Sequence, residues 1–317
     1  MRSLDRSLTS PDGLAEEALK VGPEEFIGLI EDVGRILLDE ARGISRGDGF
    51  KVVGRLVYLP TSGEALVIGD LHGDLKSLTL ILRRSGLPGR LSRENVYLIF
   101  LGDYGDRGIF SPEVYYVVLT LKRMFPGRVV LLRGNHEGPR DLLAHPHDLP
   151  YYLEKKFQGS GREIYRRLTE LFDYLHLAVL VEGRYVMLHG GVPSEAENVD
   201  DVAYAHMKHP EESHLEEILW SDPVEGIRGT LFSPRGAGKL FGPDVTERFL
   251  KIVGARLLIR GHEPSEEGFK MNHSGKVLTL FSRRGPPYYN SAGAYLHLDL
   301  SEEVEEPKEI IRRVHKF

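Results

Sequence analysis

Residues 65–74 read ALVIGDLHGD, and residues 96–108 read VYLIFLGDYGDRG. Each stretch is an apolar run of strand length that ends in Gly-Asp and further polar residues. Three later stretches have the same form: RVVLLRGNHE (128–137), RYVMLHGG (184–191) and ARLLIRGHE (255–263). Ligands in α/β proteins gather at the carboxyl ends of strands, where loops converge. These five strand ends therefore predict one polar site assembled from distant parts of the chain.

The segments around these strands predict a layered fold. Helical patterns lie near residues 75–85, 111–125, 162–175 and 244–253. Further strands are expected at 52–59, 276–282 and 292–300. Alternation of strands and helices, followed by strand-rich sequence, favours a layered α/β (α+β) fold over a helical bundle.

The chain divides into three parts by pattern. Residues 1–48 predict a helical extension: Pro23 and two glutamates suit the first turn of a helix, apolar residues then recur at helical spacing, and Gly43 ends the run. We expect this extension, with or without a second helix before it, to pack on a single catalytic domain at 49–305. Residues 306–317 are expected to form a solvated tail or an exposed final strand.

Composition excludes several classes of protein. The 317 residues include no cysteine, which excludes disulfides, thiolate metal sites and phosphocysteine chemistry. A net charge of −6 gives no electrostatic reason to expect nucleic acid. No apolar run approaches the roughly 18 residues that a membrane span needs. The first 20 residues lack an apolar signal core, so we expect no membrane association and a cytoplasmic location.

Taken singly, each polar cluster has an ordinary structural explanation. Gly-Asp after a strand is usually a turn, and a lone histidine there is usually a hydrogen-bonded structural residue. Five such clusters in order are not explained in that way. Carboxylate, amide and imidazole ligands without thiolate suit Mn, Fe or Zn. A carboxylate that bridges two ligand sets would define a two-metal site able to activate water.

With these motifs in place, the sequence resembles the PPP family of metal-dependent phosphoprotein phosphatases, within the calcineurin-like metallophosphoesterases. The resemblance covers about residues 50–300 and rests on GDLHGD, GDYGDRG and GNHE together. Later signatures are HGG at 189–191, LWSDP at 219–223, Arg235–Gly236 and RGH at 260–262. The resemblance implies a central β-sandwich flanked by helices.

The resemblance also implies roles for particular residues. The ligands of a first metal would be Asp70 and His72, and Asp103 would bridge both metals. The ligands of the second metal would be Asn135, His189 and His262. The phosphate oxygens would be bound by Arg107 and Arg235, together with Asn135. His136 would be the general acid, and Asp106 would orient its imidazole.

The implied cofactors are two divalent metal ions per chain, with Mn expected to serve in vitro and Fe or Zn as further options. The implied substrates are phosphoserine and phosphothreonine proteins, hydrolysed by direct attack of a metal-bridging hydroxide; phosphotyrosine activity stays open. Regulatory subunits are not indicated. Two alternatives are a diadenosine tetraphosphate hydrolase of the same superfamily and a phosphopeptide-binding protein without turnover.

Some features depart from the family or carry a weaker signal. At residues 282–290, SRRGPPYYN replaces the loop typical of protein phosphatase type 1; either Tyr288 or Tyr289 could stand beside the metals, or both could simply pack the loop. The two arginines of this loop could bind phosphate or acidic substrate residues. His145 and His147 fit a solvated loop better than the site rim. The histidines expected on the surface are His206, His209 and His214.

Overall fold

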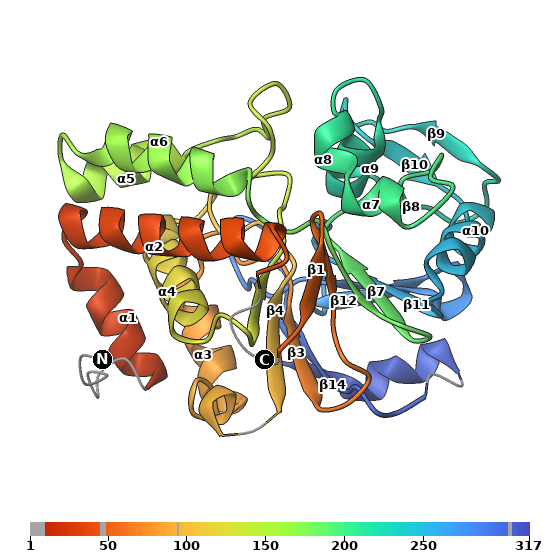
Figure 1. Cartoon of the computed structure of the whole chain (residues 1–317), viewed down its shortest axis with the longest axis horizontal. Helices are drawn as coiled ribbons and strands as arrows, with labels where there is room; N and C mark the ends of the chain where they lie inside the picture. Colours follow the sequence, from red (N-terminus) through yellow and green to blue (C-terminus); the bar gives the residue numbers. More distant parts are fainter. Residues whose placement is uncertain (1–9, 45–48, 94, 304–305) are drawn as a thin grey trace.

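The computed structural model describes residues 10–44, 49–93, 95–303 and 306–317. Two β-sheets lie face to face at its centre, with helices on both outer sides (Figure 1). The five-stranded sheet has the order β15 (Val314–Lys316), β14 (Ala294–Asp299), β3 (Glu64–Ile68), β4 (Val96–Phe100) and β5 (Val129–Leu131). The seven-stranded sheet has the order β1 (Lys51–Val53), β2 (Leu56–Tyr58), β6 (Ala178–Val181), β7 (Tyr185–Leu188), β11 (Leu257–Arg260), β13 (Val277–Leu280) and β12 (Phe269–Asn272).

Alternation of side chains along each strand creates three apolar layers. On β3, Ala65 and Val67 face the other sheet, whereas Leu66 and Ile68 face the helices. Successive residues of a strand point to opposite faces, so a strand covered on both faces is apolar throughout. The continuous apolar runs of the sequence therefore follow from the sandwich.

One helical layer covers the five-stranded sheet. It contains α1 (Pro11–Lys20), α2 (Pro23–Ala41), α3 (Leu75–Arg84), α4 (Ser111–Met124), α5 (Leu149–Phe157) and α6 (Gly161–Phe172). Leu14 of α1 and Phe26 of α2 are fully buried in the same cluster as the sheet residues. The first two helices thus share a core with the rest of this layer.

The opposite layer covers the seven-stranded sheet. It contains α7 (Asp200–Ala203), α8 (Ala205–Lys208), α9 (His214–Trp220) and α10 (Pro243–Val253), together with a small sheet of β8 (Asp222–Pro223), β10 (Lys239–Phe241) and β9 (Thr230–Phe232). Short 3₁₀ turns occupy Gly89–Ser92, His273–Gly275 and Pro307–Arg313.

The architecture confirms the predicted fold class and the four predicted helices. The predicted strand at 52–59 is wrong as one element, because β1 and β2 form a hairpin around Gly54. Gly54 has a φ of 59°, and a Cβ there would lie 2.4 Å from the carbonyl oxygen of Ala203, so the chain turns where only glycine fits. Strand β6 and helix α5 were not predicted from the sequence.

The ends of the chain divide between described and undescribed parts. Of the extension expected at 1–48, residues 1–9 and 45–48 lie outside the described residues, as do 304–305 near the expected tail. Within the described part, the final segment forms an edge strand, because β15 pairs antiparallel with β14. No helix of that part is long and apolar enough to cross a membrane.

The topology brings the five predicted strand ends to one edge. Strands β3, β4 and β5 run parallel, and so do β7, β11 and β13 in the other sheet. An isolated parallel bridge between Asp70 and Phe281 joins the two sheets where β3 and β13 end. Loops from both sheets therefore meet at the same place.

Candidate metal centre

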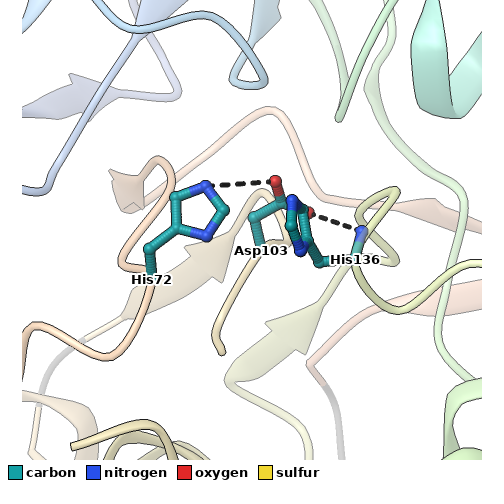
Figure 2. A group of neighbouring side chains, drawn as sticks. All are labelled: His72, Asp103 and His136. Atoms are coloured by element: carbon teal, nitrogen blue, oxygen red, sulfur yellow. Dashed lines mark hydrogen bonds and ion pairs between the residues drawn. The ribbon is translucent and has the colours of Figure 1, made fainter. Parts of the chain in front are cut away.

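The loops after β3 and β4 place three predicted ligands together. Asp103 Oδ2 lies 3.4 Å from His72 Nε2, and Asp70 Oδ2 lies 3.9 Å from the same nitrogen. All three side chains are at most 2% exposed. Figure 2 shows the His72 ring facing the Asp103 carboxylate, with the backbone N–H of His136 donating to that carboxylate from another side.

The loops after β5, β7 and β11 bring three more predicted ligands to the other side of Asp103. His189 Nε2 lies 3.4 Å from Asp103 Oδ1. Asn135 Oδ1 lies 3.1 Å from His189 Nε2 and 3.1 Å from His262 Nδ1. The Asp103 carboxylate thus faces one group of side chains with each of its oxygens.

Backbone carbonyls fix which ring nitrogens face the centre. His72 Nδ1–H donates to the carbonyl oxygen of Gly105, and His189 Nδ1–H donates to that of Leu101, both at 2.9 Å. In a neutral imidazole the other nitrogen then carries a lone pair. Both Nε2 atoms therefore present lone pairs toward Asp103, as ligand histidines do.

Carboxylate, amide and imidazole groups converge here. Asn135 Oδ1 lies 3.1 Å from a ring nitrogen of His189 and of His262, and with its amide rotated the NH₂ group would donate to those nitrogens and to Asp103. Asp70 Oδ2 and His262 Nε2 are buried without a hydrogen-bond partner among the described residues. Buried acceptors that face one another are costly unless a cation neutralises them, so the residues fit metal ions.

The pKa shifts agree with this reading. Burial, and then the charge of Asp103, raises the pKa of Asp70 to about 6. Burial lowers the pKa of His189 to about 4, despite the nearby Asp70. Burial also places the pKa values of His72 and His262 well below the ordinary value. The histidines are therefore held neutral, which is the form that binds a metal.

The backbone is strained where it presents these side chains. His72, Asp103 and His262 have φ values of 43°, 55° and 73°, in the left-handed region that favours glycine. A Cβ on Gly134 would lie 2.1 Å from Asp103 Oδ1, and one on Gly261 would lie 2.4 Å from Asp70 Oδ1. Glycine at these two positions lets one loop approach the carboxylate of another.

Two groups of side chains could each hold an ion, and Asp103 belongs to both. The first group is His72, Asp103 and His136, and the second is Asp103, His189 and His262. A third group, Asp201, Glu212 and His214, differs because the Lys208 ammonium already lies 2.9 Å and 3.1 Å from its two carboxylates.

His136 and Asp106 form a pair beside the centre. His136 Nδ1–H donates to Asp106 Oδ2 at 2.6 Å, and His136 Nε2 is buried without a partner in the described chain. Burial opposes protonation, but the charge of Asp103 and the bond to Asp106 raise the pKa of His136 above its ordinary value. The pair can therefore hold a proton next to the metal ligands.

The two predicted phosphate-binding arginines differ in placement. Arg107 is largely buried; its Nη1 donates to the Tyr288 hydroxyl at 2.5 Å, and its Nε has no partner within the described residues. Arg235 is more exposed, and its Nε donates to Asp222 at 2.6 Å. Asp222 also accepts from Arg260 and lies 3.9 Å from His262 Nε2, so it tethers Arg235 beside the centre.

Several weaker sequence interpretations need correction. His147 is not a solvated residue, because its Nδ1 lies 2.7 Å from Asp106 Oδ2; His145 is exposed as expected. His214 is buried rather than on the surface. Arg283 is buried too, and it donates to the carbonyl oxygens of His72 and Pro286 instead of facing substrate.

The two candidate tyrosines are now distinguished. The Tyr288 ring stacks on His72 at a centroid distance of 5.6 Å, whereas Tyr289 is 77% exposed. Asp222 belongs to the LWSDP segment, but its contacts with Arg235 and Arg260 depend on the folding of distant segments and could not be predicted from that segment. For His147, the carboxylate partner lies 41 residues away along the chain.

Fold and site together define a metallophosphoesterase. The family model of calcineurin-like phosphoesterases matches residues 64–266, and the chain belongs to that family. A probable serine/threonine-protein phosphatase of Encephalitozoon cuniculi is 37% identical over 260 residues, which are 81% of this chain and 54% of that protein. The predicted resemblance to serine/threonine phosphatases is thereby confirmed.

Solved structures share the fold. A serine/threonine phosphatase from Saccharomyces cerevisiae with similarity to human phosphatase PP5 has a TM-score of 0.73 at 24% identity, covering 94% of this chain and 89% of that chain. A cold-active protein-tyrosine phosphatase of a psychrophilic Shewanella species has a TM-score of 0.54 at 16% identity, covering 79% and 78%. The chain spans about half the length of the curated relatives it matches. The family implies divalent metal ions, and the His/Asp groups of this centre could bind them.

Proposed function

We propose that the protein is a metal-dependent phosphoprotein phosphatase that acts on phosphoserine and phosphothreonine. The observation that carries the proposal is the Asp103 carboxylate, which faces a separate potential ion-binding group with each oxygen. The serine/threonine phosphatase relative at 37% identity supports the choice of phosphoprotein substrates over nucleotide anhydrides.

We assign two divalent ions to this centre, with Mn as the ion to test first and Fe or Zn as alternatives. Asp70, His72 and Asp103 would hold one ion. Asp103, Asn135, His189 and His262 would hold the other. When bound, such a pair supplies an activated water and neutralises charge on the phosphoryl group. The protein contributes buried, neutral imidazoles whose other ring nitrogens are held by backbone carbonyls.

The remaining residues act on the substrate. Arg107 Nε is buried without a partner among the described residues and would donate to a phosphate oxygen, while Tyr288 accepts from Nη1 of the same guanidinium. Arg235, tethered by Asp222, would bind phosphate from the opposite layer. Both guanidinium groups would stabilise the charge that spreads over the phosphoryl oxygens in the transition state.

His136 would protonate the departing oxygen of the serine or threonine. His136 Nδ1 is bonded to Asp106, whereas His136 Nε2 has no partner in the described part of the chain. A proton on Nε2 can therefore be given to the substrate. Alkoxides are poor leaving groups, and a positioned acid typically accelerates their departure by roughly 100- to 10,000-fold. A His136 ring nitrogen also lies within 4.8 Å of ligand atoms of His72 and Asp103, next to the proposed metal site.

The test compares substrates under one condition with Mn added. Phosphoserine, phosphothreonine and phosphotyrosine peptides, diadenosine tetraphosphate and p-nitrophenyl phosphate should be assayed with the full chain, with and without a chelator. We expect metal-dependent hydrolysis of phosphoserine and phosphothreonine peptides at a higher kcat/KM than of the dinucleotide. A preference for the dinucleotide, or phosphopeptide binding without turnover, would refute the proposal.

A further inference from the structure

The histidine that the sequence placed in a solvated loop contacts the catalytic pair directly. His147 Nδ1 lies 2.7 Å from Asp106 Oδ2, the same oxygen that His136 Nδ1 approaches to 2.6 Å. The His147 side chain is only 12% exposed. Two imidazoles therefore share one carboxylate oxygen, although a single histidine would suffice for an acid and its orienting aspartate.

The second ring nitrogen of His147 has a partner as well. His147 Nε2 lies 2.9 Å from the hydroxyl oxygen of Tyr165 on α6. If His147 is neutral and donates from Nδ1, its Nε2 accepts from the Tyr165 O–H. The hydrogen bonds then run from Tyr165 to His147 to Asp106, and Asp106 receives a second bond from His136. The Tyr165 hydroxyl and the Nδ1–H groups of His147 and His136 thus each have an acceptor.

The other carboxylate oxygen of Asp106 is fixed by the backbone. Asp106 Oδ1 accepts from the N–H of Asp148 at 2.9 Å and from that of Leu149 at 2.7 Å. These two residues follow His147 directly, so the loop that carries His147 also closes around the carboxylate. Residues 147–149, which lie outside the motifs shared with the phosphatases, thus supply three hydrogen bonds to Asp106, and His136 supplies another.

His147 and the proposed acid also line the same cleft. His136, His147, Tyr165, Arg140, Leu143 and Phe172 border an open cavity of about 510 Å³. A chain leaving the phosphorylated residue on the side of His136 would pass this cleft. The hydrogen-bonded residues His147 and Tyr165 therefore border the open space next to the proposed acid, His136.

We propose that His147 is a positioning residue: with Tyr165 it orients the Asp106 carboxylate, and thereby aims His136 Nε2 at the leaving oxygen. This inference rests on the proposed function. It predicts an effect confined to substrates whose leaving group needs a proton. A serine alkoxide needs one, whereas p-nitrophenolate leaves readily without protonation.

The test measures kcat for a phosphoserine peptide and for p-nitrophenyl phosphate with Mn in parallel. We expect His147→Ala to lower kcat for the peptide about 10-fold or more, a part of the roughly 100- to 10,000-fold that a positioned acid contributes. Turnover of p-nitrophenyl phosphate should be unchanged, which also shows that the variant is folded and binds metal. Tyr165→Phe should give a smaller loss with the same selectivity.

Two matched variants complete the experiment. His147→Asn places an amide N–H near the position of the imidazole Nδ1 and should restore most of the peptide activity. His145→Ala changes an exposed histidine of the same loop and should have no effect. Equal losses on both substrates, no loss on either, or an Asn variant as slow as the Ala variant would overturn the inference. Failure of the proposed function differs, because the wild-type protein itself would then not hydrolyse the peptide, and the inference would fall with it.

Discussion

Two buried polar clusters of the protein differ in whether their charged and polar groups have partners within the protein, and this difference distinguishes a structural cluster from a functional one. The first, the helix-anchor cluster, consists of Glu40 on α2, Lys122 on α4 and His176. Lys122 Nζ donates to Glu40 Oε1 at 2.6 Å and to two backbone carbonyls, while Glu40 Oε2 lies 3.0 Å from His176 Nε2. Each charged group there has an opposite charge or a donor as its neighbour.

The second cluster, at the metal centre, is as deeply buried but is not satisfied in this way. The charge of Asp103 raises the pKa of Asp70, and the lone pair of His189 Nε2 faces carboxylate and amide oxygens. Burial alone therefore does not mark a functional site. What marks it is a buried carboxylate oxygen, Asp70 Oδ2, that has no partner among the described residues and that an added cation would neutralise.

The largest expected effect comes from removing the carboxylate shared by both ion groups. We predict that Asp103→Asn lowers kcat on p-nitrophenyl phosphate by about 1,000-fold or more, because both ions lose their common ligand. The metal-free variant should unfold at the same temperature as the metal-free wild type or a higher one, since a buried like charge beside Asp70 is gone.

Activity assays with Mn and thermal unfolding in a chelator check this pair of outcomes. Asp200→Asn, which changes an exposed carboxylate, is the control and should alter neither quantity. An Asp103→Asn variant that kept a tenth of the activity, or that lost several degrees of stability without metal, would contradict the comparison.

The helix-anchor cluster should respond in the opposite sense. We predict that Lys122→Met lowers the free energy of unfolding by about 3–5 kcal/mol, because it leaves Glu40 buried without its counter-ion. The folded fraction should keep the wild-type kcat. Urea unfolding measures the first quantity, and Lys251→Met, an exposed lysine on α10, serves as the control. A loss below about 1 kcal/mol would mean that the buried charge is not dependent on Lys122.

A smaller effect is expected from pH on the same cluster. Burial raises the pKa of Glu40, but the charge of Lys122 and the bond with His176 outweigh it and hold the pKa below the ordinary 4.5. A group with a depressed folded pKa contributes stability that is present above its unfolded pKa and is lost as the pH falls through its folded pKa. The stability advantage of the wild type over Glu40→Gln should therefore shrink below pH 4.5. Urea unfolding of both proteins across that range measures it; a gap that stays constant would show that Glu40 does not titrate differently on folding.

The sequence predicted those features that depend on residues close together in the chain better than those that depend on distant residues. Glycine-flanked acids after apolar strands predicted where Asp70 and Asp103 would lie, since strand ends and tight turns are local features. His189 and His262 follow the neighbouring parallel strands β7 and β11, so their proximity also followed; their contact with Asp103 depends on how the two sheets meet. Contacts that depend on loop conformation did not follow. His147 is held by Asp106 across 41 residues, and no spacing rule connects a loop histidine to a distant carboxylate.

The same limit explains the errors in burial. His214 lies at the start of α9, a short helix whose buried face the sequence does not reveal. The guanidinium carbon of Arg283 lies 5.7 Å from the centroid of the Tyr288 ring. This arginine therefore stabilises the loop through Tyr288 and the carbonyl oxygen of Pro286 instead of binding substrate. The sequence also could not show which of Tyr288 and Tyr289 faces the metal centre, because the direction of two adjacent side chains depends on the conformation of the loop.

The smallest effect is expected at Arg107, whose guanidinium has one nitrogen with a hydrogen-bond partner, as in the helix-anchor cluster, and one without, as at the metal centre. Its Nη1 is satisfied by Tyr288, and its Nε is buried without a partner in the described residues. We predict that Tyr288→Phe lowers kcat/KM for a phosphoserine peptide about 2- to 10-fold, the value of one hydrogen bond that aims the guanidinium. Tyr289→Phe alters the same side chain one residue later, at an exposed position, and should leave kcat/KM unchanged. Steady-state kinetics of the two variants would assign the orienting role to Tyr289 if only that variant were slow. Two equal losses would mean that the loop, rather than a single hydroxyl, holds Arg107 against the phosphate.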